Sequence, residues 1–222
     1  MERNKLLEES RDRIFESLSP ITQSLGSPGR LRILQVLSNQ ASSVENLSQS
    51  TCQTIGNTSQ HLQRLLHAGL VKVERKGVSR VYSLANPHVA QLWFSLQQLA
   101  SELSPEIRHE ESIVAPAELC TEFKISKIFK MLKKQEAILI DVRTKEEWES
   151  TPVLFASHIS IDNFEEHLNE IPKSKTVFLY CRGRYCGMAN PAVRLLRKKG
   201  YEAYRLRESA LEINEFANKK VV

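Results

Sequence analysis

The chain has 222 residues, a length that fits two small domains better than one large one. Its formal net charge of +5 is only mildly basic, so the distribution of charge matters more than its total. No apolar run approaches the roughly 20 residues of a membrane span, and the charged residues 1–17 lack the apolar core of a signal peptide. We therefore expect a cytoplasmic protein without a membrane partner. The four cysteines then favour chemistry or redox sensing over a disulfide scaffold.

Helical patterns follow one another in the first seventy residues. Amphipathic helices are predicted over residues 12–25 and 28–40, a short helix over 43–50, and a longer helix over 54–68 that Gly69 ends. The longer helix has an apolar inward face and a polar outward face. Its candidate DNA-binding residues are Asn57, Thr58, Ser59, Gln60, His61, Gln63 and Arg64.

Two alternating strands are predicted over residues 70–84, joined by a turn that carries Arg75, Lys76 and Arg80. A short helix, a turn, a polar second helix and such a strand pair together predict a winged helix-turn-helix. Amide side chains pair with adenine edges and arginine with guanine, while a basic wing lies along the phosphates. The plain alternative is an ordinary solvent-exposed face.

Residues 57–62 (NTSQHL), residues 68–71 (AGLV) and the wing closely resemble the winged-helix repressors of the arsenic-repressor family. This resemblance implies a DNA-binding and dimerisation domain over residues 1–105. It also implies a homodimer formed through helices near residues 2–18 and 88–103, which binds an inverted-repeat operator in double-stranded DNA.

Many members of that family sense metals through paired cysteines or through histidine and acidic ligands. Here Cys52 stands alone, and His88 has no histidine or carboxylate partner one or two turns further on. A single thiol is a poor ligand set, so we expect no metal site and no cofactor. A metal- or arsenic-responsive repressor that uses Cys52 or Cys120 remains the weaker alternative.

A linker is predicted over residues 106–120, and the pattern then changes. A helix over 121–134 precedes an almost wholly apolar strand at 137–142, and further strands near 156–161, 176–180 and 202–206 alternate with helices near 164–170 and 190–199. This alternation predicts a small α/β domain over residues 121–222 with a parallel sheet, and chemistry at the carboxyl ends of its strands.

Cys181 follows the strand at residues 176–180 and opens a glycine-containing loop before the next helix. The positive end of that helix and the nearby arginines favour an anion, so we predict that the pKa of Cys181 lies below its usual value of about 8.5. The alternative is a small buried hydrophobe at the end of a core strand. Cys186, five residues later, is placed to attack an adduct on Cys181 and close a disulfide within the loop.

The loop resembles the active loop of rhodanese domains, which carry sulfane sulfur as a cysteine persulfide. Residues 141–143 (DVR) and 147–148 (EW) resemble a further rhodanese motif, whose arginine and glutamate brace the rim of the site or form a structural ion pair. The resemblance implies Cys181 as the sulfur-bearing residue. The sulfur cradle it implies consists of Arg182, Gly183, Arg184, Tyr185 and Gly187.

Three departures narrow the chemistry. Phosphatase relatives of this loop place an arginine where Gly187 stands, so phosphoryl transfer is disfavoured. Residues 157–160 are a shortened form of a segment that is usual in rhodaneses. Glu208 and Ser209 stand where rhodaneses carry a glycine pair late in the domain. Turnover with thiosulfate is therefore not assured. Ten lysines and arginines face one acid, Glu202, over residues 173–207, a field that attracts anionic donors such as thiosulfate.

The leading hypothesis is a transcriptional regulator whose DNA affinity responds to sulfur. A homodimer binds double-stranded DNA, and the second domain takes sulfur from a small sulfur-containing anion or persulfide donor at Cys181, with Cys186 as the resolving thiol. The competing hypothesis is a sulfurtransferase with an accessory DNA-binding domain.

Overall fold

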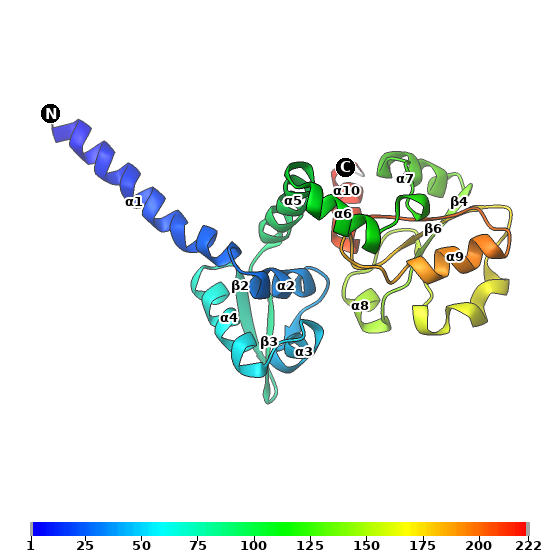
Figure 1. Ribbon diagram of the computed structural model, residues 1–222, viewed down its shortest axis with the longest axis horizontal. Helices are drawn as coiled ribbons and strands as arrows, with labels where there is room; N and C mark the ends of the chain where they lie inside the picture. Colours follow the sequence, from blue (N-terminus) through cyan, green and yellow to red (C-terminus); the bar gives the residue numbers. More distant parts are fainter. Residues whose placement is uncertain (1, 221–222) are drawn as a thin grey trace. The chain divides into compact units, whose positions relative to one another are not determined.

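The computed structural model describes residues 2–220 and divides into two units between Gln97 and Gln98 (Figure 1). The first unit is mainly helical and contains a three-stranded antiparallel sheet with the strand order β1-β3-β2. Its elements are α1 (Glu2–Leu25), α2 (Pro28–Leu37), β1 (Ser42–Ser43), α3 (Val44–Ser50), α4 (Ile55–His67), β2 (Val71–Lys76), β3 (Ser79–Leu84) and α5 (Pro87–Leu103), of which residues 98–103 belong to the second unit.

The boundaries of the helix-turn-helix follow from its caps. The side chains of Ser43 and Thr54 accept hydrogen bonds from main-chain N–H groups in the first turns of α3 and α4, which fixes where each helix begins. Gly69 then takes a positive φ of 69° and ends the helical path after α4. Leu62 and Leu65 of α4 are fully buried, so the opposite face of this helix is turned to solvent.

The second unit is an α/β fold around a four-stranded parallel sheet with the order β5-β4-β6-β7. Residues 106–120, the predicted linker, mostly belong to α6 and η1. The elements after α5 are α6 (Pro105–Val114), η1 (Ala117–Leu119), α7 (Ile125–Lys133), β4 (Ala137–Asp141), α8 (Lys145–Ser150), β5 (Ala156–His158), the 3-10 helix η2 (Ile161–Glu170), β6 (Thr176–Tyr180), α9 (Asn190–Lys198), β7 (Ala203–Arg205) and α10 (Ala210–Lys220).

The central strand β6 is buried on both faces, which explains its unbroken apolar and aromatic sequence. Val177 and Leu179 pack into a core with η2 and α9, while Phe178 and Tyr180 pack into a second core with α7 and α10. In the parallel register, Asp141 at the end of β4 lies opposite Tyr180 at the end of β6. The chain segments that leave these two strands therefore start side by side.

Candidate functional site

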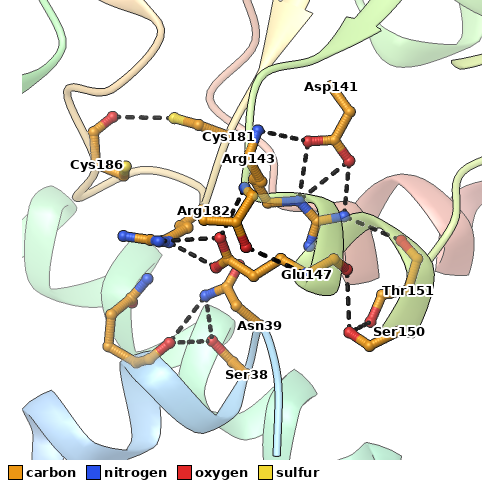
Figure 2. A network of polar contacts seen from close by, with 12 residues as sticks. Ser38, Asn39, Asp141, Arg143, Glu147, Ser150, Thr151, Cys181, Arg182 and Cys186 are labelled. Carbon is orange, nitrogen blue, oxygen red and sulfur yellow. Dashed lines mark hydrogen bonds and ion pairs between the residues drawn. The ribbon is translucent and has the colours of Figure 1, made fainter. Parts of the chain in front are cut away.

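Two cysteines lie in the loop that leaves β6. Cys181 is only 1% exposed and belongs to the apolar core between the sheet and α9, whereas Cys186 is half-buried. The Cys181 thiol donates a hydrogen bond to the main-chain oxygen of Cys186 at 3.2 Å (Figure 2). Gly183 turns the loop with a φ of 94°, and a Cβ there would lie 3.1 Å from the Cβ of Ser209. We call Cys181 and Cys186 the thiol pair and residues 181–187 the thiol loop.

The electrostatics of the thiol pair correct the sequence prediction. The pKa of Cys181 is raised well above its usual value by its hydrogen bond with Cys186, by burial, and by the negative charge of Cys186, which together outweigh Arg205. The pKa of Cys186 is instead lowered to about 6 by the hydrogen bond from Cys181, by main-chain N–H groups and by the charge of Arg182. The two thiols titrate as a coupled pair that holds one negative charge near neutral pH, and the directions of the two pKa shifts favour Cys186 as its site.

Arg182, the first residue of the predicted cradle, is held by a buried carboxylate. Its Nε lies 2.6 Å from Oε1 of Glu147, and its Nη2 lies 2.9 Å from Oε2 (Figure 2). Glu147 is 1% exposed and also closes the capping box of α8 with Thr144. The hydrogen bond to Glu147 raises the pKa of Arg182. This guanidinium is committed to an ion pair.

A second buried ion pair lies beneath this one. Asp141 and Arg143 are both fully buried, and the guanidinium binds the carboxylate through Nε and Nη2 at 2.7 to 3.1 Å (Figure 2). The hydroxyl of Tyr180 donates to the same carboxylate at 2.6 Å, which joins the ends of β4 and β6. The arginine and the glutamate of the motif therefore pair with other residues: Arg143 binds Asp141, and Glu147 binds Arg182.

Arg184 and Tyr185 face α6 rather than the sulfur atoms. Nη1 of Arg184 lies 3.3 Å from Oε2 of Glu111, a residue of α6 that is only 5% exposed. The pKa of Tyr185 is raised by burial and by the charge of Glu111. Both arginines of the thiol loop are therefore engaged by buried carboxylates. These two carboxylates offset part of the positive charge that the sequence places in the thiol loop.

Arg205 of β7 is a functional candidate that the sequence analysis did not single out. This fully buried guanidinium donates from Nη2 to the main-chain oxygens of Gly183 and Arg184, at 3.0 and 3.4 Å. Its Nη1 donates to the main-chain oxygen of Val114 and to Oδ1 of Asn190, at 2.9 and 3.2 Å. Arg205 is the last residue of β7 and lies on the same buried face as Ala203, so the two-residue alternation of a strand was the available signal.

Most of the predicted DNA-binding residues are exposed to solvent, and Thr58 and His61 are exceptions. Residues Asn57, Gln60, Gln63, Arg64, Arg75, Lys76 and Arg80 are exposed on α4 and the wing, and Ser59 is partly exposed. Thr58 is a correction: it is fully buried, and its hydroxyl donates to the main-chain oxygen of Thr54, so it does not face DNA. His61 is half-buried against Gly29, and burial together with Arg30 and Arg64 lowers its pKa.

No cluster of three or more histidine, cysteine, aspartate or glutamate residues suited to a metal ion occurs within residues 2–220. In the same part of the chain, no helix is long and apolar enough to cross a membrane. The thiol pair places a thiol whose pKa is lowered beside a thiol whose pKa is raised in one loop. This arrangement suits sulfur exchange and disulfide formation.

A helix-turn-helix with a basic wing, followed by an α/β domain with a cysteine-bearing loop, defines a two-domain DNA-binding regulator. Family models match both parts: "Bacterial regulatory protein, arsR family" matches residues 27–73, and "Rhodanese-like domain" matches residues 126–215. The chain belongs to the arsR family of bacterial transcriptional regulators and carries a rhodanese-like domain. Both family assignments and the two-domain fold class predicted from the sequence are confirmed.

Several characterised or solved proteins are similar to this chain. The HTH-type transcriptional regulator Rv0324 of Mycobacterium tuberculosis is 29% identical over 201 residues, which cover 90% of this chain and 88% of that protein. A tRNA sulfurtransferase of Desulfurococcus amylolyticus is 39% identical over 72 residues, 32% of this chain and 14% of that protein. The homodimeric winged helix-turn-helix domain Mb0332 of Mycobacterium bovis is 28% identical, covers 41% of this chain and 85% of that chain, and has a TM-score of 0.40.

Proposed function

We propose that this regulator acts in the cytoplasm as a homodimer whose affinity for an inverted-repeat operator depends on the sulfur state of the thiol pair. The observation that carries the proposal is the difference in burial and in pKa between two cysteines that contact each other within one loop. Cys186 is half-buried and its lowered pKa favours the thiolate, whereas Cys181 is buried, its raised pKa favours the thiol, and this thiol donates to the main-chain oxygen of Cys186 at 3.2 Å. This combination favours capture of a sulfur atom followed by a disulfide.

The chemistry proceeds in two steps with an organic persulfide, R–S–SH, as donor. The Cys186 thiolate attacks the outer sulfur of the donor, the S–S bond of the donor breaks, and R–S⁻ leaves while Cys186 becomes a persulfide. The Cys181 sulfur then attacks the inner sulfur of this persulfide, and its proton leaves with the expelled sulfur as hydrogen sulfide. The two cysteines are oxidised to a disulfide, and the transferred sulfur is reduced. The roles predicted from the sequence are thus exchanged, because Cys186 holds the charge.

DNA binding is supported by the exposed face of α4 and by the wing. The basic side chains Arg75, Lys76 and Arg80 surround the turn between β2 and β3, and Nε of Arg75 donates to the main-chain oxygen of Gly77. Arg64 and the amide side chains of α4 occupy the outward face of the preceding helix. This pairing suits a recognition helix in the major groove and a wing along the backbone phosphates.

Dimerisation is supported by apolar side chains that the chain leaves uncovered. α1 exposes five large apolar residues, and α5 exposes three more, each between 41% and 73% exposed. These residues are Leu6, Leu7, Ile14, Phe15, Leu18, Leu92, Leu99 and Leu103. Such a density of exposed apolar surface on two helices favours burial against a second copy of the chain.

A sulfurtransferase remains the second candidate, because the rhodanese-like domain spans most of the second unit. Catalytic turnover requires that the persulfide pass to an external acceptor. In this loop a second thiol stands next to the first, so we expect the internal disulfide to form faster than transfer. Steady-state turnover with thiosulfate and cyanide near background would support the regulator, and rapid turnover that is lost in Cys186→Ser would support the enzyme.

The test combines intact-mass measurement with operator gel shifts on the same samples, before and after addition of glutathione persulfide. The wild-type protein is expected to lose two hydrogens and to change its mobility shift with operator DNA. Cys181→Ser is expected to gain the mass of one sulfur atom, and Cys186→Ser is expected to remain unmodified. Cys52→Ser, which alters an exposed cysteine of the other unit, is the matched control and should behave as wild type. Unchanged mass in the wild-type thiol loop would refute the proposal.

A further inference from the structure

Helix α6 is joined to the thiol loop through the carboxylate of Glu111. Oε2 of Glu111 accepts from Nη1 of Arg184 at 3.3 Å and from the hydroxyl of Ser101, in the last turn of α5, at 2.9 Å. Glu111 is therefore shared by the thiol loop and by α5. Nη1 of Arg108, also on α6, donates to the main-chain oxygens of Ser101 and Glu102, which strengthens the corner between α5 and α6.

The end of α6 makes a second attachment, through the main-chain oxygen of Val114. This oxygen accepts from Nδ2 of Asn190 and from Nη1 of Arg205, both at 2.9 Å. A Cβ on Gly187 of the thiol loop would lie 3.3 Å from the same oxygen, so the loop and the helix end approach closely. Arg205 also holds the oxygen of Gly183, and one buried guanidinium thereby fixes both the thiol loop and α6.

The Glu111 carboxylate is buried, so its contacts with the thiol loop offset a desolvation cost. Glu111 is 5% exposed, and its Oε1 has no hydrogen-bond partner among the described residues. Ser101 and Tyr185 also hydrogen-bond to this carboxylate, but Arg184 supplies the opposite charge. Loss of the ion pair therefore leaves a buried carboxylate without its charged partner, which favours movement of the helix. A cavity of about 450 Å³ beside the contact leaves room for such movement; it is lined by Glu106, Ile107, Glu110, Glu111, Val114 and Tyr185.

We propose that α6 changes its attachment to the thiol loop when the thiol pair forms a disulfide, and that Glu111 is the positioning residue of this response. This inference rests on the proposed function. Disulfide formation removes the negative charge of Cys186 and the thiol proton that Cys181 donates to the Cys186 oxygen. The loop between them then shifts, Arg184 leaves Glu111, and α6 is released. Because α5 is one helix from Pro87 to Leu103, a change at Ser101 continues along it toward the residues that follow the wing.

The test uses Glu111→Gln in the 222-residue chain, with Glu110→Gln, an exposed neighbour on the same helix, as the control. Operator affinity is measured by fluorescence anisotropy with and without glutathione persulfide, and sulfur uptake by intact mass. We expect Glu111→Gln to react as wild type but to lose most of a donor-induced change of about tenfold, while Glu110→Gln keeps it. A full response in Glu111→Gln would overturn the inference.

A second measurement does not depend on any sulfur donor. Diamide accepts two electrons and two protons from a dithiol, so it joins the thiol pair without sulfur transfer. We expect faster amide hydrogen exchange over residues 105–114 in the oxidised wild type and no acceleration in Cys186→Ser. Equal exchange in the reduced and oxidised protein would overturn the role of α6. Failure to take up sulfur with accelerated exchange would instead refute only the choice of donor in the proposed function.

Discussion

The pH dependence of Cys186 reactivity is the prediction that tests the thiol pair most closely. The main cause of its low pKa, about 6, is the side-chain interaction with the Cys181 thiol, which lies close enough to share its proton between the main-chain oxygen and the sulfur of Cys186. Cys181→Ser keeps a hydroxyl donor at this position, whereas Cys181→Ala removes the donor. We therefore expect the titration midpoint of Cys186 to stay low in the serine variant and to rise clearly in the alanine variant.

The magnitude follows from the fraction of thiolate and from its intrinsic reactivity. At pH 7 a thiol with a pKa of about 6 is about 90% ionised, whereas a free cysteine with a pKa of about 8.5 is about 3% ionised. Because it is less basic, ionised Cys186 reacts about 10- to 20-fold more slowly than an ionised free cysteine. The net rate advantage of Cys186 over a free cysteine is therefore only about twofold to threefold at pH 7. At pH 6 the same reasoning gives about tenfold, because the free thiol is almost wholly protonated.

The assay is the rate of alkylation by iodoacetamide between pH 5 and about 9, with Cys186 followed in its own peptide by mass spectrometry. The rate should rise as pH increases through about 6 and then level off, because the thiolate is the reactive form. A midpoint near the free-cysteine value in wild type, or the same low midpoint in Cys181→Ala, would refute the shared-charge description.

Four further predictions concern the fold, DNA and assembly. Asp141→Asn leaves the buried guanidinium of Arg143 without its carboxylate and should lower the free energy of unfolding by about 3 to 5 kcal/mol, measured by urea denaturation. Gly183→Ala forces an alanine into a φ of 94° and should lower it by about 1 to 3 kcal/mol in the same assay. Arg75→Ala should weaken binding to all DNA sequences and reduce the salt slope by about 1. Phe15→Glu should shift the protein to monomer in sedimentation, and an unchanged dimer would exclude α1 from the interface.

Much of the fold was predictable because its signals are local. The apolar strand at residues 137–142 and the strand before Cys181 were recognisable from composition, and both lie in the parallel sheet. The order of helices in the first unit followed from periodicity and capping residues. Thr58 was misassigned although it lies four residues before buried Leu62, a spacing that places both on the same face of α4.

The electrostatics of the site were not predictable, because they depend on contacts distant in sequence. The sequence shows arginines near Cys181, but Arg182 is paired with Glu147 and Arg184 with Glu111, 35 and 73 residues away. The depth of Cys181 in the core is equally invisible in a linear pattern. The coupling between the two thiols and the burial of Cys181 set the direction of the two pKa shifts, and neither can be read from the number of arginines in the loop.

The most direct test of the proposed regulation is the operator affinity of one preparation measured with the thiol pair reduced and again after glutathione persulfide has joined it. We predict a change of about tenfold, equivalent to about 1.4 kcal/mol, that reductant reverses and that is absent when both cysteines are serine. Equal affinity in the two states, with the disulfide verified by mass in the same sample, would contradict the account.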